Sequence, residues 1–314
     1  MAPNDARNYP STARAARKTG LPVKFVIDSN QLPVPNPPRE SLLRRFLSAS
    51  TRNIAVLTDY AAMEAYKGDT LAGIYKSMSV LSEFPKQVEV LKSTLVVCGL
   101  HGRKAGLQRR LVDERQTRGF PRFVAELRRA QQGSVLYQES LLRHGLEANR
   151  HLGRLLADAQ STGAAFKKIA ALYSKDERRN IREGLHYTDE FINKTVKQVI
   201  QIAGLAFREH PMAHIRPSFE EVPNTFIFRV SLCTYLLALD WAANGGAEGA
   251  TPATLRNDIV DMNFAAYATY FDGLLTSDAK VKRVHAEARL WLSALFQVDM
   301  PSGWQGAQIS LPPP

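Results

Sequence analysis

The hydrophobic positions near the N-terminus fall into short continuous runs separated by amphipathic stretches. Val23-Lys-Phe-Val-Ile-Asp28 is a β-branched and aromatic run that predicts a buried strand, and Asn53-Ile-Ala-Val-Leu57 predicts a second one. The stretch Ser41–Ser50 between them has the spacing of a short helix. Another helix follows Leu57, with Thr58 or Asp59 as its cap. Strand, helix, strand, helix predicts a parallel α/β sheet.

The pattern changes in the middle of the chain. From about Leu71 to Asn244, apolar residues recur three and four positions apart with few strand signals, as in Val135–Ala159 and Asp176–Arg208. Phe226–Ala243 is a strongly apolar helical stretch that ends at a Gly-Gly pair. We therefore expect an all-helical region here.

The α/β pattern returns near the C-terminus, where Leu255–Tyr270 predicts a helix, Asp272–Thr276 a short strand and Ala279–Phe296 a last amphipathic helix. The expected organisation is a basic flexible arm over residues 1–22, an α/β part over 23–70, a helical insertion over 71–250, a second α/β part over 251–300 and a tail over 301–314.

The composition of the chain indicates which kinds of binding partner to expect. The apolar share of 45% is that of a globular protein, and the formal charge of +11 favours an acidic polymer such as nucleic acid. The apolar run Phe226–Ala243 is interrupted by Arg229 and Asp240, so we expect no membrane partner and a soluble, cytoplasmic protein. The two cysteines, Cys98 and Cys233, lie in apolar runs and predict buried free thiols.

Carboxylates fall at the ends of the predicted elements. Asp28 ends one strand, Asp278 follows another, and Asp258 and Asp261 lie near the start of the helix between them. Ligands of parallel sheets bind beyond the carboxyl ends of the strands. Carboxylates gathered there repel one another unless cations neutralise them, and oxygen-only ligands suit hard ions. The pattern predicts a site for Mg²⁺ or Mn²⁺.

These motifs resemble those of PIN-domain nucleases. Val26-Ile-Asp28-Ser-Asn30 is similar to the family's opening strand, and Thr58-Asp-Tyr-Ala-Ala-Met-Glu64 occupies the place of its second acid. Asp261-Met-Asn-Phe-Ala-Ala-Tyr-Ala268 and Phe271-Asp-Gly-Leu-Leu-Thr276-Ser-Asp278 are similar to its helix-opening acid, its small-residue helix and its strand ending in Thr-x-Asp.

The resemblance implies a PIN-like three-layer sandwich with a central parallel sheet, a large all-helical insertion and catalytic acids that bind the metal. Those acids are Asp28, Glu64, Asp261 and Asp278. Asn30 and Thr276 would orient a ligand or water, or else satisfy local backbone groups. Asp258 is either an additional metal ligand or a charge that complements the start of the helix.

The insertion is not explained by the resemblance, because compact PIN domains place the second and third acids much closer in sequence. It carries a basic patch that could contact a phosphate backbone, or be a solvated helix face. Its candidate nucleic-acid contacts are Arg103, Lys104, Arg109, Arg110, Arg128 and Arg129. A second basic group contains Lys167, Lys168, Lys175, Arg178, Arg179 and Arg182.

The expected function is therefore a Mg²⁺- or Mn²⁺-dependent endoribonuclease. It would be a toxin-like or defence effector that acts on structured RNA such as transfer RNA, with a protein inhibitor or antitoxin as a partner. The alternatives are a structure-specific DNase of the flap type and a non-catalytic nucleic-acid-binding scaffold with the same fold. The oligomeric state is left open by the sequence.

Overall fold

The computed structural model describes residues 21–32, 41–67, 70–184, 187–213, 217–245 and 250–301, and the side chains of 155–162 are not described. The expected basic arm and tail lie almost wholly outside these ranges. A parallel sheet has the strand order β3-β2-β1-β4. Its strands are β1 (Val23–Ile27), β2 (Asn53–Leu57), β3 (Val88–Val90) and β4 (Gly273–Leu275). The mixed α/β class with a parallel sheet is confirmed, and strands from the two ends of the chain lie side by side.

The expectation that residues 71–250 are all helical is wrong, because β3 lies inside this stretch and extends the sheet beside β2. Ala55 of β2 pairs with Val88, and Leu57 pairs with Val90. The strand has only three residues, one of them Glu89, so it lacks the long apolar run that marks β1 and β2.

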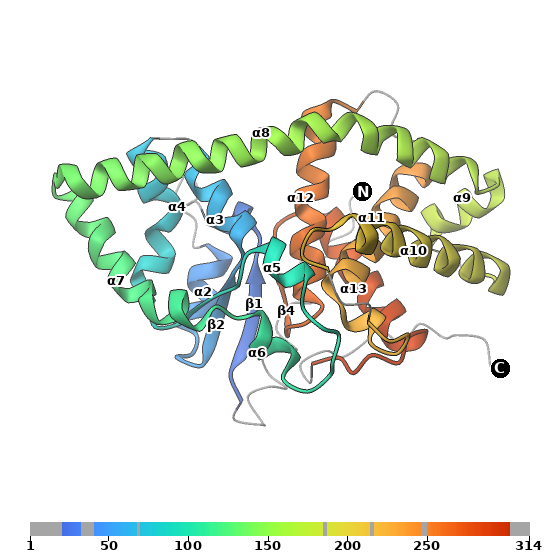
Figure 1. Cartoon of the computed structure of the whole chain (residues 1–314), viewed down its shortest axis with the longest axis horizontal. Coiled ribbons are helices and arrows are strands. Elements are labelled where there is room, and N and C mark those ends of the chain that lie inside the picture. The colour runs from blue at the N-terminus through green and yellow to red at the C-terminus, as the bar shows by residue number, and fades with distance from the viewer. Residues whose placement is uncertain are drawn as a thin grey trace, which may run out of the picture.

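The helices of the N-terminal part of the chain surround the sheet (Figure 1). After the 3-10 turn η1 (Ser29–Gln31), they are α2 (Leu42–Ser48), α3 (Asp59–Tyr66), α4 (Leu71–Glu83), α5 (Thr94–Cys98), α6 (Leu107–Leu111) and α7 (Glu114–Gln131). The C-terminal side of the chain contains α9 (Lys175–Glu183), α10 (Asp189–Glu209), the 3-10 turn η2 (Val222–Asn224), α11 (Phe226–Ala243), α12 (Pro252–Ala268) and α13 (Ala279–Ala294).

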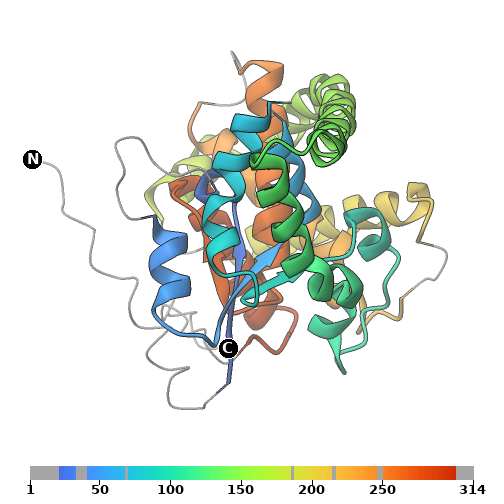
Figure 2. The same ribbon diagram turned by 90° about the vertical axis from the view of Figure 1, so that its left-hand side faces the viewer.

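One long helix, α8 (Val135–Ala171), joins these two sides. At 37 residues it is roughly 55 Å long. It packs on α3, α4 and α7 and then on α11 and α12, crossing the molecule from end to end in Figure 1. Figure 2, turned by 90°, shows α8 nearly end-on beside the helices of the N-terminal side.

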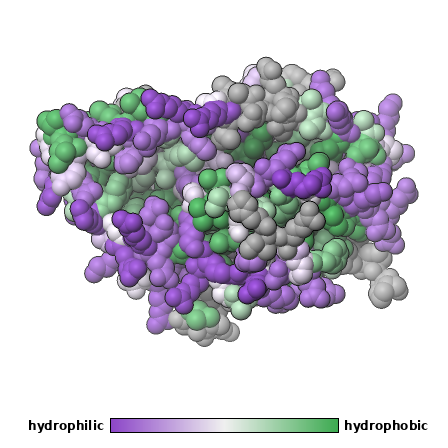
Figure 3. Space-filling model, in the orientation of Figure 1, coloured by the Kyte–Doolittle hydropathy of each residue, from purple (hydrophilic) through white to green (hydrophobic). Residues whose placement is uncertain are grey.

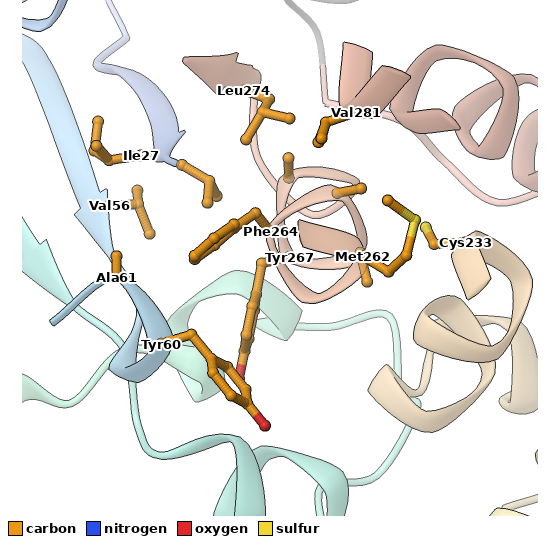
Figure 4. Packing of buried hydrophobic residues seen from close by; sticks show 14 of the residues in the cluster. Ile27, Val56, Tyr60, Ala61, Cys233, Met262, Phe264, Tyr267, Leu274 and Val281 are labelled. Carbon is orange, nitrogen blue, oxygen red and sulfur yellow. The ribbon is translucent and has the colours of Figure 1, made fainter. Parts of the chain in front are cut away.

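Helix α12 occupies the centre of the core. Phe264 and Tyr267 lie on its side toward β2 and α3, whereas Met262 lies toward Cys233 of α11 (Figure 4). The ring of Tyr267 packs on that of Phe226 with centroids 4.2 Å apart. The small residues of α12, Ala265, Ala266 and Ala268, are fully buried, which lets neighbouring elements approach the helix closely. The sheet and the surrounding helices therefore share one hydrophobic core.

In the described part of the chain, α11 is the one helix long and apolar enough to cross a membrane, but 78% of that window is buried inside the fold. This is the burial of a helix in the protein core, and both cysteines are buried free thiols as expected. The outer face in Figure 3 is mostly hydrophilic along α8. Apolar side chains gather where that helix begins, at the exposed Val135 and Leu136.

Candidate active site

Asp28 lies where β1 ends, buried to 1% exposure. Its backbone N–H donates to the carbonyl of Leu275 on β4 at 3.0 Å, which fixes it at the carboxyl edge of the sheet. Its carboxylate accepts hydrogen bonds from Thr276 Oγ1, from Asn30 Nδ2 at 2.6 Å and from the Asn30 backbone N–H at 3.2 Å. Burial raises the pKa of Asp28, and the hydrogen bond from Thr276 opposes that rise.

Thr276 and Asn30 connect the ends of β1 and β4. Asn30 Nδ2 donates to Thr276 Oγ1 at 3.1 Å, and Asn30 Oδ1 accepts from the backbone N–H of Ser277 at 3.2 Å. Thr276 Oγ1 also accepts from the backbone N–H of Asp278 at 3.0 Å. Both residues therefore hold the Asp28 carboxylate and also satisfy local backbone groups, so the two expectations for them are compatible.

Asp278 forms the N-cap of α13. Its Oδ1 accepts from the backbone N–H groups of Lys280 at 2.6 Å and Val281 at 3.2 Å. Burial is the largest cause that raises the pKa of Asp28, and the negative charge of Asp278 raises it further. The two carboxylates are therefore close enough to repel each other. They converge although 250 positions separate them in the sequence, as adjacent parallel strands require.

Asp261 joins them from α12. The pKa of Asp261 is raised to about 8, first by burial and then by the negative charges of Asp28, Asp278 and Asp258, and the ammonium of Lys280 acts in the opposite direction. This side chain is therefore mostly protonated at neutral pH in the absence of a cation. The structure thus brings together three of the four acids that the resemblance implies.

Asp258 has its own protein partners. It is 5% exposed and accepts from Lys280 Nζ at 2.5 Å and from Trp241 Nε1 at 3.0 Å. The expectation that it complements the start of the helix is wrong, because α12 begins at Pro252 with Thr251 as its cap, two turns earlier. Its ion pair with Lys280 uses one carboxylate oxygen that a metal ion would otherwise bind.

Glu64 stands apart from the other acids. Its helix, α3, packs against η1 beside Asp28, but its carboxylate pairs with Lys67 at 2.8 Å. It is not among the charges that act most strongly on Asp28 or Asp261. The structure therefore places Glu64 on an element that packs beside Asp28, with its carboxylate paired to Lys67.

The cluster has the donor chemistry of a hard-cation site but is closed by internal bonds. Within the described ranges, no three His, Cys, Asp or Glu side chains are arranged so that they could hold a metal ion. In the arrangement described, Asp28 accepts hydrogen bonds from Thr276 and Asn30, and Asp278 accepts from the first turn of α13. Burial, and after it the charges of the neighbouring carboxylates, hold the pKa of Asp261 high. A divalent cation would neutralise those charges, so the residue types fit Mg²⁺ or Mn²⁺.

Lys280 and Trp241 contact the acidic residues through Asp258 and are not among the site residues expected from the sequence. Lys280 follows Asp278 by two positions, and its side chain crosses from α13 to Asp258 on α12. It also lies 5.5 Å from the centre of the Trp241 ring on α11. The sequence contains no signal for this arrangement, because three helices must pack together before these side chains meet.

The six basic residues proposed for nucleic-acid contact form two groups. Arg103, Lys104 and Arg109 lie in and before α6, and each pairs with an acidic side chain. Arg128 and Arg129 lie at the far end of α7, which is about 27 Å long. They do not form one continuous patch with the first group.

Arg110 belongs to the first group by sequence but is half-buried. Its guanidinium donates to the backbone carbonyls of His101 and Arg103. It therefore holds the loop before α6 in place. This internal role leaves Arg110 less available to a phosphate than its exposed neighbour Arg109.

Comparison of the chain with protein-family models, with curated proteins and with solved structures found no match.

Proposed function

We propose that this protein is a PIN-like Mg²⁺- or Mn²⁺-dependent nuclease that hydrolyses RNA phosphodiester bonds internally. The observation that supports it is the convergence of Asp28, Asp261 and Asp278 at the carboxyl edge of the sheet, with the pKa of Asp261 raised to about 8. A group of acids that keeps one member protonated is unfavourable for the bare protein, and cation binding removes that cost.

Asp28, Asp261 and Asp278 would hold the cation, and Glu64 would complete the set if its carboxylate left Lys67. A bound divalent cation supplies a water of lowered pKa and stabilises charge on phosphate oxygens. The chain's own residues orient the ligands: Thr276 and Asn30 hold the Asp28 carboxylate at the strand end. The α13 backbone holds the carboxylate of Asp278.

RNA is the proposed substrate because the charge of +11 favours a polyanion and the PIN resemblance favours RNA over DNA. Arg103, Lys104 and Arg109 are highly exposed, and their ion pairs involve surface carboxylates, so a phosphate backbone can replace those partners at little cost. A toxin-like role on structured RNA, with a protein inhibitor, belongs to the same proposal.

A specific observation favours a second candidate, a non-catalytic RNA-binding scaffold of the same fold. Lys280 places an ammonium beside Asp258 and within reach of Asp261, where it supplies part of the positive charge that a metal ion would bring. In a scaffold this lysine would replace the cation permanently.

Cleavage of end-labelled RNA and DNA by the purified protein separates these functions. The nuclease proposal predicts RNA fragments with Mg²⁺ or Mn²⁺, none with EDTA, and none from Asp261→Asn. The matched control is Asp176→Asn on α9, an exposed aspartate far from the cluster in sequence, which should cleave as the parent does. Fragments from DNA alone would favour the flap-type DNase. Binding of RNA without any metal-dependent cleavage would favour the scaffold.

A further inference from the structure

A cavity lies on the opposite edge of the sheet from the acidic cluster. It has a volume of about 840 Å³ and is lined by the start of β1, by α6, by the first turns of α7 and by the end of α12. Lys24 lines it at the beginning of β1, whereas Asp28 lies at the other end of that strand. The cavity is therefore separate from the candidate active site, and its size is that of small-molecule sites in proteins.

The charge lining this cavity is positive. Five basic and three acidic side chains contribute to the wall. Each acid pairs with one of the bases, as Glu89 does with Lys24 at 2.6 Å, Glu114 with Arg109 at 3.2 Å and Asp299 with Lys104 at 3.4 Å. Arg118 and Arg229 remain without a carboxylate partner among the described residues.

Arg229 is the more unusual of the two because it is 2% exposed. Its guanidinium donates to three neutral oxygens: the carbonyl of Pro223 at 3.0 Å, Thr269 Oγ1 at 3.0 Å and Asn224 Oδ1 at 3.2 Å. The Tyr270 ring covers one face at 3.7 Å. A guanidinium has five N–H groups, so the described bonds leave two of them without an acceptor.

A buried cation without a counter-ion is costly, and a bound anion would supply the missing charge. The neutral oxygens and Tyr270 fix the guanidinium plane in advance, and a planar guanidinium matches the paired oxygens of a phosphate group. Arg118 is exposed at the wall of the same cavity, and its Nε donates to the backbone carbonyl of Glu114. Arg118 can therefore contact the solvent-facing side of an anion that is bound to Arg229.

We propose that this cavity binds a phosphate monoester, such as inorganic phosphate or the phosphate of a mononucleotide, between the buried Arg229 and the exposed Arg118. Thr269 and Tyr270 follow directly on α12, the helix that carries Asp261. An anion bound there contacts the end of the helix on which the acidic cluster is built. This site does not depend on the proposed nuclease activity.

Calorimetric titration with inorganic phosphate and with AMP tests the site, in EDTA and at constant ionic strength. The parent should bind both, and adenosine should not bind. Arg118→Gln should bind phosphate at least about tenfold more weakly, because a charge-assisted hydrogen bond is lost. Arg115→Gln is the matched control, since Arg115 is an exposed arginine on the same helix that does not line the cavity.

Two further variants separate this site from the rest of the molecule. Asp261→Asn should bind phosphate as the parent does, because its carboxylate lies at the other edge of the sheet. Arg229→Lys keeps the charge but loses the planar guanidinium, and it should lower the affinity further than Arg118→Gln does. If Arg229→Lys does not fold, Arg118→Gln against Arg115→Gln decides. Absence of phosphate binding to the parent, or equal affinity in Arg118→Gln and Arg115→Gln, overturns the proposal.

Discussion

The hydroxyl of Thr276 donates a hydrogen bond to a carboxylate oxygen of Asp28, although 248 positions separate the two residues. This bond joins the carboxyl ends of β1 and β4 and satisfies a buried acid. Thr276→Val keeps the shape of the side chain and leaves Asp28 without its hydroxyl donor. We expect a loss of about 1–3 kcal/mol in the free energy of unfolding at pH 7, measured by urea denaturation.

The control for Thr276→Val is Thr254→Val, which removes an exposed hydroxyl whose partner is Thr251. It should change the free energy of unfolding by less than about 0.5 kcal/mol. Equal losses in the two variants would mean that the Thr276 hydroxyl does not stabilise Asp28.

Asp261 gives the stability of the protein a pH dependence. The pKa of Asp261 in the folded state is raised to about 8, above its value in an unfolded chain, so the folded state holds the proton more tightly. The free energy of unfolding therefore falls as pH rises from about 4 to about 8, because over this range Asp261 is ionised in the unfolded chain and still protonated in the folded state. Asp261→Asn removes this effect. Relative to the parent, it should gain about 1–3 kcal/mol in free energy of unfolding between pH 5 and pH 8, in EDTA.

Chemical denaturation of both proteins at the two pH values measures this difference. Asp176→Asn should show no such gain, because Asp176 is 79% exposed in its pair with Arg179. If the stability of the parent and of Asp261→Asn depended on pH in the same way, the raised pKa of Asp261 would be contradicted.

Lys280 forms an ion pair with the buried carboxylate of Asp258 at 2.5 Å. Lys280→Met leaves the buried carboxylate of Asp258 without its charged partner and removes the cation that acts on Asp261. We expect a loss of about 2–4 kcal/mol in free energy of unfolding at pH 7. Arg179→Met breaks an exposed pair with Asp176 and should lose less than about 1 kcal/mol. Similar losses would show that Asp258 does not need Lys280.

RNA binding should depend on the exposed basic residues before and within α6. Arg103→Gln with Arg109→Gln removes two exposed cations, which are 71% and 83% exposed, and leaves Arg110 to hold the loop. The slope of log affinity against log salt for single-stranded RNA should fall in magnitude by about 1.4. Fluorescence anisotropy at several salt concentrations measures it. An unchanged slope would place the RNA contacts elsewhere, with Lys167, Lys168, Arg178 and Arg179 as the next candidates.

Much of the sheet could be predicted because its elements are marked locally. The apolar runs of β1 and β2 and the apolar helix α11 have the expected bounds to within a residue. Asp28 and Asp278 could be placed together from the rule that parallel strands end at the same edge. The three-residue β3 could not be predicted, because it is a strand through its pairing with β2 and its own composition does not mark it as one.

The side-chain contacts within the acidic cluster could not be predicted from the sequence, because they depend on how helices pack together. Lys280 and Asp258 are 22 positions apart on two helices, and their contact follows from how α13 packs across α12. Glu64 has a nearby alternative partner, Lys67, three positions later on the surface. Arg229, which interrupts an apolar run in the sequence, is buried because η2 and α12 supply oxygens around it.

The most direct test of the metal site is a crystal of the protein soaked in Mn²⁺, with anomalous diffraction recorded from the metal. We expect a peak at the carboxyl edge of the sheet, with oxygens of Asp28, Asp261 and Asp278 about 2.1–2.2 Å away, and no peak in crystals of Asp261→Asn. A parent crystal with no peak at this edge, and with Asp28 still bonded to Thr276 and Asp258 to Lys280, would contradict the metal site and with it the proposed nuclease.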